Sequence, residues 1–387
     1  MARATLLEVW DDRFREYDFG PGHPFTQTSR WLAHRLLEES GSLAGGAGSA
    51  VVRVRKVDPA PREVLLSFHR PGYLDLVERL SDSGSGELLD RGDTPSFPGC
   101  YEASARVAGG TLRALSEISE GGAKRAVNLS GGLHHAQPQR ASGFCIFNDV
   151  ALAVAGALRP RGKFSKVAYV DIDAHHGDGV MYGFYGSGRL LDIDFHQDGR
   201  TLFPGTGEVG ETGRADGSGL KVNVPLPPWS GDEAFVPLFE RIVPPLVRSF
   251  RPGLIILQHG TDAHADDKLA QLEYTPRSYT TAVRTLRMLA DELCEGRLLM
   301  TGGGGYTSSN VARVLARSVR ELLEPPQEVP DSSPTPARWR TEYEAAFDAP
   351  APTDFRPPRP AGHSPWSADR TDRLVHELSE RLGFKLP

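Results

Sequence analysis

The sequence has few cysteines, no long apolar run and no excess of basic residues, and each of these absences excludes a class of protein. Its 387 residues include only three cysteines, Cys100, Cys145 and Cys294. Their wide spacing matches neither a disulfide framework nor a zinc knuckle. We therefore expect a protein of the reducing cytoplasm.

Apolar runs are short throughout the chain. None approaches the ~20 consecutive apolar residues that a helix needs to cross a bilayer, and the first residues, MARATLLEVWDDRF, meet acidic side chains too early for a secretory signal. The net charge is -6, with both signs interspersed, whereas nucleic-acid binding usually requires a basic surface. The expected protein is soluble, with no membrane contact and no direct contact with nucleic acid.

Five short apolar runs each end in polar or glycine-rich residues, as buried parallel strands do when they lead into a site. Segments with a helical pattern lie between them, so strands and helices alternate. This order predicts an α/β protein of three layers, in which helices flank a central, mostly parallel sheet. The runs are residues 126–130, 167–170, 190–196, 254–260 and 298–305, and the helical segments are 148–158, 232–250 and 276–295.

The domain organisation expected from composition is one large domain, residues 1–324, followed by an extension, residues 325–387. Small-residue stretches at 41–50 and 81–86 are interpreted as surface loops rather than linkers. The extension is dense in proline up to residue 365 and regains a helical pattern only at 367–382. We expect it to wrap the surface or to contact a partner.

The segment 171–179 (DIDAHHGDG) contains the densest group of metal-binding and proton-handling side chains, directly after an apolar run. Open α/β sheets bind ligands at the carboxyl ends of their strands. Asp173 and His175 can turn toward one point there, and Asp262, which follows another run, is the candidate third ligand. Three protein ligands leave room for water and substrate, as in a catalytic zinc site, although this ligand set would also accept iron or manganese.

The tandem imidazoles of His134 and His135 also follow an apolar run, and paired imidazoles are suited to proton transfer near neutral pH. Such imidazoles need their far ring nitrogens fixed, commonly by a carboxylate. Asp171 and Asp178 are the carboxylates available for this purpose.

Four consecutive glycines, residues 302–305, end another apolar run and precede Tyr306. Glycine lets the backbone approach a substrate closely, and a phenol placed there could donate a hydrogen bond to a developing oxyanion. A phosphate cradle is the other interpretation of this run, but the lysine and the helix-opening Ser or Thr of a phosphate loop are missing.

Together these motifs closely resemble the arginase-like deacetylase family, which includes the histone deacetylases and the bacterial acetoin-utilisation deacetylases. The resemblance extends from about Tyr17 to Leu323. It rests on residues 17–24 (YDFGPGHP), 92–95 (GDTP), 131–136 (GGLHHA), 141–145 (ASGFC), 171–179, 203–207 (FPGTG), 260–262 (GTD) and 302–307 (GGGGYT).

The resemblance implies an arginase/deacetylase-like fold and a zinc-dependent catalytic domain that hydrolyses an acyl amide. The acyl group is typically acetyl, carried by a lysine side chain of a peptide or protein or by a small amine, and Fe²⁺ is a possible alternative to Zn²⁺. Asp173, His175 and Asp262 correspond to the metal ligands, and Tyr306 to the residue that polarises the scissile carbonyl.

The remaining catalytic positions also follow from the resemblance. His135 corresponds to the general base and then acid, with His134 as its electrostatic partner. Asp178 would orient His135, and Asp171 would orient His134.

The substrate channel can be located in the same way. Phe144 and Phe203 correspond to aromatic walls that enclose a lysine stem together with Gly143. Asp93 corresponds to a rim carboxylate that accepts backbone N–H groups of a peptide, and Leu269 falls near the same rim.

Two positions depart from the family pattern. Asp194 stands where relatives carry a serine that helps to bind a structural monovalent cation such as K⁺ beside Asp171, so its carboxylate would tighten that cation or replace it. An additional residue near Arg30 leaves open whether Arg30 or Ser29 occupies the basic pocket behind the metal.

Three other functions compete with the zinc deacylase. The segment 262–266 (DAHAD) resembles the metal loop of arginases, so a two-metal guanidine or amidine hydrolase is one alternative. An acetylpolyamine amidohydrolase and a catalytically silent binder of acylated ligands are the others. The sequence predicts neither the natural substrate nor the oligomeric state.

Overall fold

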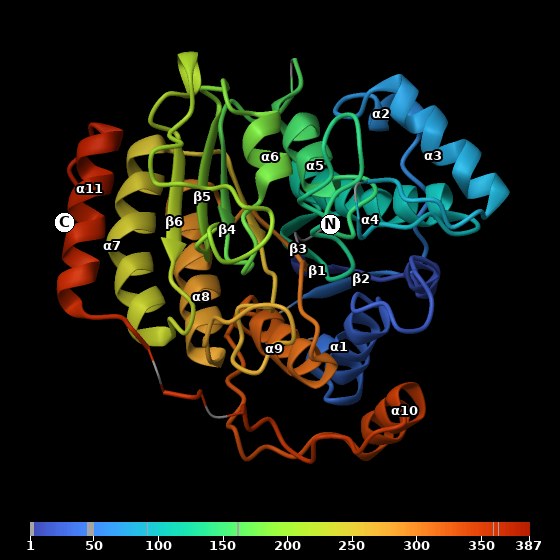
Figure 1. Cartoon of the computed structure of the whole chain (residues 1–387). Helices are drawn as coiled ribbons and strands as arrows, with labels where there is room; N and C mark the ends of the chain where they lie inside the picture. Colours follow the sequence, from blue (N-terminus) through green and yellow to red (C-terminus); the bar gives the residue numbers. More distant parts are fainter. Residues whose placement is uncertain (1–3, 45–49, 91, 161, 359, 363) are drawn as a thin grey trace.

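A single sheet of eight strands organises the protein in the computed structural model, which describes residues 4–44, 50–90, 92–160, 162–358, 360–362 and 364–387 (Figure 1). The strand order is β2-β1-β3-β8-β7-β4-β5-β6, and every neighbouring pair is parallel. The strands are β1 (Ala4–Val9), β2 (Val51–Val54), β3 (Ala123–Asn128), β4 (Val167–Asp171), β5 (Leu190–Gln197), β6 (Lys221–Leu226), β7 (Leu254–Gln258) and β8 (Leu298–Thr301).

Both faces of the sheet are buried, which explains why its central strands are apolar at nearly every position. Side chains alternate along β4, so that Ala168 and Val170 join one hydrophobic core while Val167 and Tyr169 join the other. Helices α1, α7, α8 and α9 contribute to the first core, and α3, α4 and α5 to the second. The predicted three-layer α/β fold is confirmed.

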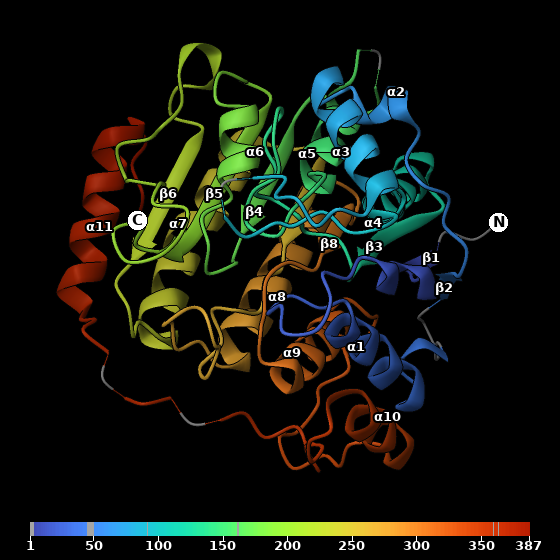
Figure 2. The same ribbon diagram turned by 45° about the vertical axis from the view of Figure 1, so that its right-hand side comes forward.

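The helices on the two faces lie in separate layers (Figures 1 and 2). Their bounds are α1 (Thr28–Glu39), α2 (Arg62–Leu65), α3 (Pro71–Ser83), α4 (Cys100–Glu120), α5 (Asp149–Leu158), α6 (Asp178–Gly183), α7 (Asp232–Phe250), α8 (Pro276–Leu293), α9 (Ser308–Glu321), α10 (Ala337–Phe347) and α11 (Ala368–Leu382). None of the described helices could cross a membrane.

The two loop predictions were only partly right. Residues 81–83 form the last turn of α3, and Gly84 ends that helix in the left-handed conformation, with φ 57°. The first half of this stretch thus belongs to the helix, and residues 84–86 lie beyond it. In the other stretch Ser42–Ala44 form a 3₁₀ helix, and residues 45–49 lie outside the described part of the chain.

The extension after residue 324 runs along one side of the molecule in both ribbon views and ends at α11, which packs on α7 (Figures 1 and 2). It contains α10, which the loss of apolar periodicity had concealed. Trp339 of α10 is fully buried, and its indole N–H donates to the Leu32 carbonyl of α1 at 2.8 Å. The extension therefore wraps the surface, while the division at residue 324 stays a prediction.

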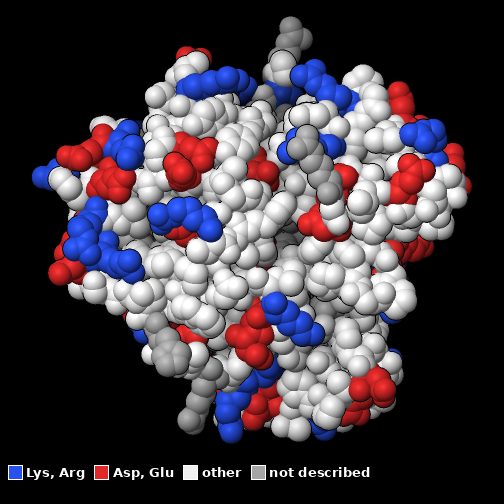
Figure 3. All heavy atoms as spheres, in the orientation of Figure 1, with Lys and Arg blue, Asp and Glu red and all other residues white. Residues whose placement is uncertain are grey.

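Charged side chains of both signs are scattered over the face shown in Figure 3. No part of this face combines many basic residues without acidic ones nearby. The pattern agrees with the interspersed charges of the sequence and its net charge of -6. All three cysteines are free and buried.

Candidate metal and catalytic site

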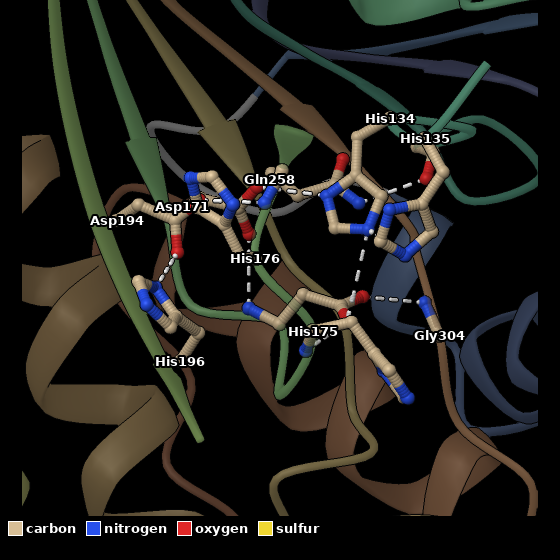
Figure 4. Close-up of polar contacts among 12 residues, drawn as sticks. His134, His135, Asp171, His175, His176, Asp194, His196, Gln258 and Gly304 are labelled. Atoms are coloured by element: carbon tan, nitrogen blue, oxygen red, sulfur yellow. Dashed lines mark hydrogen bonds and ion pairs between the residues drawn. The ribbon is translucent and has the colours of Figure 1, made fainter. Parts of the chain in front are cut away.

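The candidate site lies at the carboxyl ends of four adjacent strands, β3, β8, β7 and β4 (Figure 4). Each strand leads directly into one of the motifs identified in the sequence. Because parallel strands end at the same edge of the sheet, the four motifs meet there. Residues that are up to 170 positions apart in the chain, such as His134 and Gly304, thereby become neighbours.

Asp173, His175 and Asp262 form a compact, buried group in which one potential ligand atom from each lies within 4.8 Å of the others. Backbone N–H groups hold the two carboxylates in place. Gly304 donates to Asp173 at 2.7 Å, and Ala174 donates to Asp262 at 2.8 Å. The predicted ligands are brought together, and their orientation is fixed by the loops that carry them.

Glycine is required where these loops cross. A Cβ atom on Gly260 would lie 1.9 Å from Asp173 Oδ2, and one on Gly304 would lie 2.0 Å from Asp262 Oδ2. Both contacts are far shorter than any side chain tolerates. The glycine run therefore has a steric purpose that is independent of substrate, since it makes room for the carboxylates.

The electrostatics of the group favour a cation. Burial, and then the nearby Asp173, raise the pKa of Asp262 to about 7. Burial opposes the charged form of His175, but the two carboxylates outweigh it and raise its pKa to about 10. Two buried carboxylates and one imidazole are a donor set that zinc, iron and manganese accept. The cluster could therefore bind a divalent ion.

The imidazoles of His134 and His135 lie side by side (Figure 4), with their Nε2 atoms 3.1 Å apart. Each Nδ1 contacts a carboxylate oxygen at 2.8 Å, Asp171 for His134 and Asp178 for His135. This is the pairing that the sequence resemblance implied. The two Nε2 atoms thus face each other, and that of His134 is 3.9 Å from Asp173 Oδ1.

The two imidazoles prefer different protonation states. Burial disfavours the charge on His134, but Asp171 and then Asp173 overcome it and raise the pKa to about 10. Burial, followed by the charge on His134, lowers the pKa of His135 to about 4 despite Asp178. At neutral pH His134 is the charged member of the pair, and its Nε2–H donates to the unprotonated Nε2 of the neutral His135.

Tyr306 and two phenylalanines lie beside this group. The Tyr306 ring lies edge-on to Phe144 and to His175, with centroids 5.9 and 6.2 Å apart. Phe203 is 43% exposed and lies edge-on to His135 at 5.2 Å. A Cβ atom on Gly143 would lie 2.6 Å from the His135 ring, so only glycine fits beside it. The predicted channel residues therefore lie together beside His135 and His175.

The rim residues Asp93 and Leu269 lie in loops that are organised by other carboxylates. Asp90 accepts the backbone N–H of Asp93 at 3.1 Å, and Asp267 accepts that of Leu269 at 2.9 Å. Burial, and then the neighbouring Asp90, raise the pKa of Asp93 to about 6. Asp267 also accepts the backbone N–H of Tyr306 at 2.9 Å, which links the loop of Leu269 to Tyr306.

Asp194 lies beside Asp171 in the structure, since a Cβ atom on Gly177 would be 2.6 Å from the carboxylate of Asp171 and 3.2 Å from that of Asp194. Asp194 accepts the Gly177 N–H at 2.7 Å and contacts His196 Nδ1 at 2.7 Å (Figure 4). The other nitrogen of His196 contacts the Gly207 carbonyl at 2.9 Å. An imidazole that donates to two acceptors is protonated, so His196 supplies a positive charge here.

The open choice between Arg30 and Ser29 is answered by geometry. The Arg30 guanidinium is buried behind the glycine run, where it donates to the carbonyls of Gly303 and Gly305. Ser29 instead donates to Ser308 at 2.9 Å.

His264, which suggested an arginase-like metal loop, is directed elsewhere. Its Nδ1 donates to the Ala265 carbonyl at 2.7 Å, and its ring stacks on Tyr279. Within the described residues, Asp173, His175 and Asp262 are the one group of three or more potential ligands.

Sequence reasoning missed several amides that support the site. Gln137 donates to Asp178 at 2.8 Å, and Gln258 donates to the Gly132 carbonyl at 2.8 Å. Asn148 donates to the carbonyls of His134 and Ala136, at 2.8 and 3.0 Å. No local pattern marks these residues except for Asn148, whose place before an apolar helix is typical of an N-cap.

Comparison with known proteins agrees with this geometry. A family model described as "Histone deacetylase domain" matches residues 23–322. The chain is 35% identical to the acetoin utilization protein AcuC of Bacillus subtilis over 367 residues, which cover 91% of each chain. It is 33% identical to AcuC of Staphylococcus xylosus over 360 residues, which cover 91% of this chain and 90% of the relative. The chain therefore belongs to the histone deacetylase family.

Proposed function

We propose that this protein is a zinc-dependent deacylase that removes an acetyl or other acyl group from a lysine side chain or from a small amine. Membership of the histone deacetylase family supports a deacetylase that acts on acetylated substrates. The observation that carries the finer proposal is the convergence of Asp173, His175 and Asp262 within 4.8 Å. Beside them lie two imidazoles, of which one has a raised pKa and the other a lowered pKa.

The residues of the chain divide the chemistry among them. A divalent ion held by Asp173, His175 and Asp262 would supply Lewis-acid activation of water and of the substrate carbonyl. His135, neutral and oriented by Asp178 at 2.8 Å, would accept the proton of the attacking water and later give it to the leaving amine.

His134 and Tyr306 would stabilise charge rather than transfer the main proton. His134 remains protonated through its contact with Asp171 at 2.8 Å. The Tyr306 hydroxyl would donate a hydrogen bond to the carbonyl oxygen as negative charge develops there. Phe144, Phe203 and Gly143 would exclude water from the stem of the substrate.

The direct test is hydrolysis by the protein freed of metal and then reloaded with zinc or with iron. We expect one ion per chain by elemental analysis, and amide hydrolysis on a panel of acyl-lysine peptides and acetylpolyamines. Two manganese ions per chain with release of urea from a guanidine would overturn the proposal in favour of the arginase-like alternative. Ligand binding without turnover would leave a silent binder.

We also propose a monovalent cation such as K⁺ beside Asp171 and Asp194. These two neighbouring, buried carboxylates attract positive charge, and His134 on Asp171 and His196 on Asp194 are the charges that compete with the cation. In the same preparation, a melting temperature that rises with KCl but not with tetramethylammonium chloride would support the cation. Equal responses would indicate that His196 replaces it. The cytoplasmic location stays a prediction.

A further inference from the structure

The motif at residues 17–24 takes no part in the proposed chemistry, yet its side chains gather behind one wall of the channel. That wall is Phe144, whose φ of 66° is in the left-handed region that non-glycine residues rarely adopt. Gly143, just before it, has a φ of 52°. Two consecutive left-handed residues need external contacts to hold them.

Both backbone polar groups of Phe144 are bonded by side chains from distant segments. The Tyr17 hydroxyl donates to the Phe144 carbonyl at 2.6 Å and accepts the Ile146 N–H at 3.1 Å. The Thr94 hydroxyl accepts the Phe144 N–H at 3.0 Å. Tyr17 and Thr94 are both fully buried, so water cannot replace either bond.

The Thr94 hydroxyl is itself fixed by the rim loop. It donates to Asp90 Oδ2 at 2.6 Å, and Asp90 Oδ1 accepts the backbone N–H groups of Gly92, Asp93 and Thr94 at 2.9 to 3.1 Å. With its proton committed to Asp90, the oxygen is free to accept from Phe144. The position of the wall is thereby linked to the loop that carries Asp93.

The ring of Phe144 is held by the same motif. The His23 ring lies edge-on to it, with centroids 4.6 Å apart, and Phe25 is tilted against it at 6.5 Å. His23 is anchored at both nitrogens, since Nδ1 accepts the Phe25 N–H at 3.2 Å and Nε2 contacts the Asp93 carbonyl at 3.3 Å. The ring therefore has neighbours on the side away from the channel.

From these contacts we propose that Tyr17, His23 and Thr94 are positioning residues that hold Phe144 in its left-handed conformation and so set the width of the channel for an unbranched aliphatic stem. The inference deepens the proposed function, because the stem of an acylated lysine is the group that this wall would contact. It assigns specificity for the stem to a part of the chain that does not touch the reacting atoms.

The test compares two hydroxamates on the zinc-loaded protein. Acetohydroxamic acid reaches the ion without a stem, whereas octanohydroxamic acid adds an unbranched chain. Tyr17→Phe and Thr94→Val should each raise the dissociation constant of octanohydroxamic acid about tenfold, the effect of losing the contacts of one or two methylenes. The constant for acetohydroxamic acid should change less than about twofold, and Thr94→Ser should restore stem binding.

Tyr73→Phe is the matched control. The Tyr73 hydroxyl is also buried and donates to the Ile146 carbonyl at 2.7 Å, in the same segment but without contact to the Phe144 backbone. Tyr73→Phe should weaken both hydroxamates equally or neither. An equal loss of both in Tyr17→Phe and Thr94→Val, or no loss in either, would overturn the inference.

This result is separable from the proposed function, because binding is measured without turnover. A protein that binds octanohydroxamic acid selectively through Tyr17 and Thr94 yet hydrolyses no amide would refute the deacylase and leave the inference intact.

Discussion

At the scale of single residues, the tandem histidines differ in proton affinity although they are neighbours in the sequence. His134 contacts Asp171, while burial, and then the charge on His134, lower the pKa of His135 to about 4. One carboxylate per imidazole is therefore insufficient to make them equivalent. The pair has one charged and one neutral member, which agrees with the separate roles proposed for them.

A substitution at His135 tests this division. His135→Ala should lower kcat on an acetyl-lysine peptide by about 10² to 10⁴-fold, the usual contribution of a positioned general base. Metal content should stay at the wild-type value, because His135 is outside the ligand group. Asp173→Ala is the contrasting variant, which should lose the ion as well, as elemental analysis would reveal. Turnover like that of the wild type in His135→Ala would exclude the assignment.

At the scale of elements, the N-terminus of α5 supports the loop that carries the tandem histidines. Asn148 caps the helix by accepting the Ala151 N–H at 2.8 Å, and its amide donates to the carbonyls of His134 and Ala136. Asp149 accepts the backbone N–H of Leu133 at 2.7 Å. The first residues of α5 thus bond to both carbonyl and N–H groups of this loop.

Removing the amide should therefore affect stability and activity together. Asn148→Ala loses an N-cap, worth about 0.5–2 kcal/mol, and leaves two buried carbonyls unpaired, at about 1–3 kcal/mol each. We expect a lower free energy of unfolding in urea and at least a tenfold lower kcat. Asn223→Ala is the control, since Asn223 is buried on β6 and donates to the Glu211 carbonyl. It should lose stability without a comparable loss of kcat; equal losses would contradict the prediction.

How much the sequence predicted also depends on the element. The strands that lead into the site were recognisable, because each is an uninterrupted apolar run followed by polar residues. β6 was missed because Lys221 and Asn223 interrupt its apolar pattern. Both are buried, and the Lys221 ammonium donates to the Leu190 carbonyl of β5 at 2.8 Å. β2 was missed because it is a short edge strand with exposed residues. The partners of buried polar side chains such as Lys221 come from other elements, so the local sequence does not reveal them.

The residues of the candidate site were likewise predictable only in part. The grouping of Asp173, His175 and Asp262 near two imidazoles was predictable, because metal binding and proton transfer restrict such sites to a few residue types at strand ends. Supporting residues such as Gln137 and Gln258 were not, because they bond to groups that only folding brings near. The Tyr17 motif was noticed through the resemblance, but its contact with Phe144 spans 127 positions and required the structure.

At the scale of the whole molecule, the chain after residue 324 is fastened to the elements before it at separate points. Trp339 inserts beside α1, and α11 packs on α7 at the far end. Between them Glu273 accepts the backbone N–H of Ala361 at 2.8 Å. In the described part of the segment between α10 and α11, Phe355 is buried and Arg317 donates to its carbonyl at 2.8 Å, so this segment has anchors of its own.

Loss of one anchor should therefore release the adjoining part of the extension before the domain unfolds. Trp339→Ala removes a fully buried indole and its hydrogen bond to Leu32, a change that typically costs about 3–5 kcal/mol. If this cost falls on the docking of α10, proteolytic cleavage between residues 325 and 365 should accelerate by about 10²-fold or more.

Trp366→Ala is the matched control, because that indole is only partly buried and bonds within the extension, to Thr371. Its cleavage near α10 should match the wild type. If Trp339→Ala is cleaved no faster than the wild type, α10 stays docked without its tryptophan. The ion pair between Arg35 and Glu342 would then be the anchor to test.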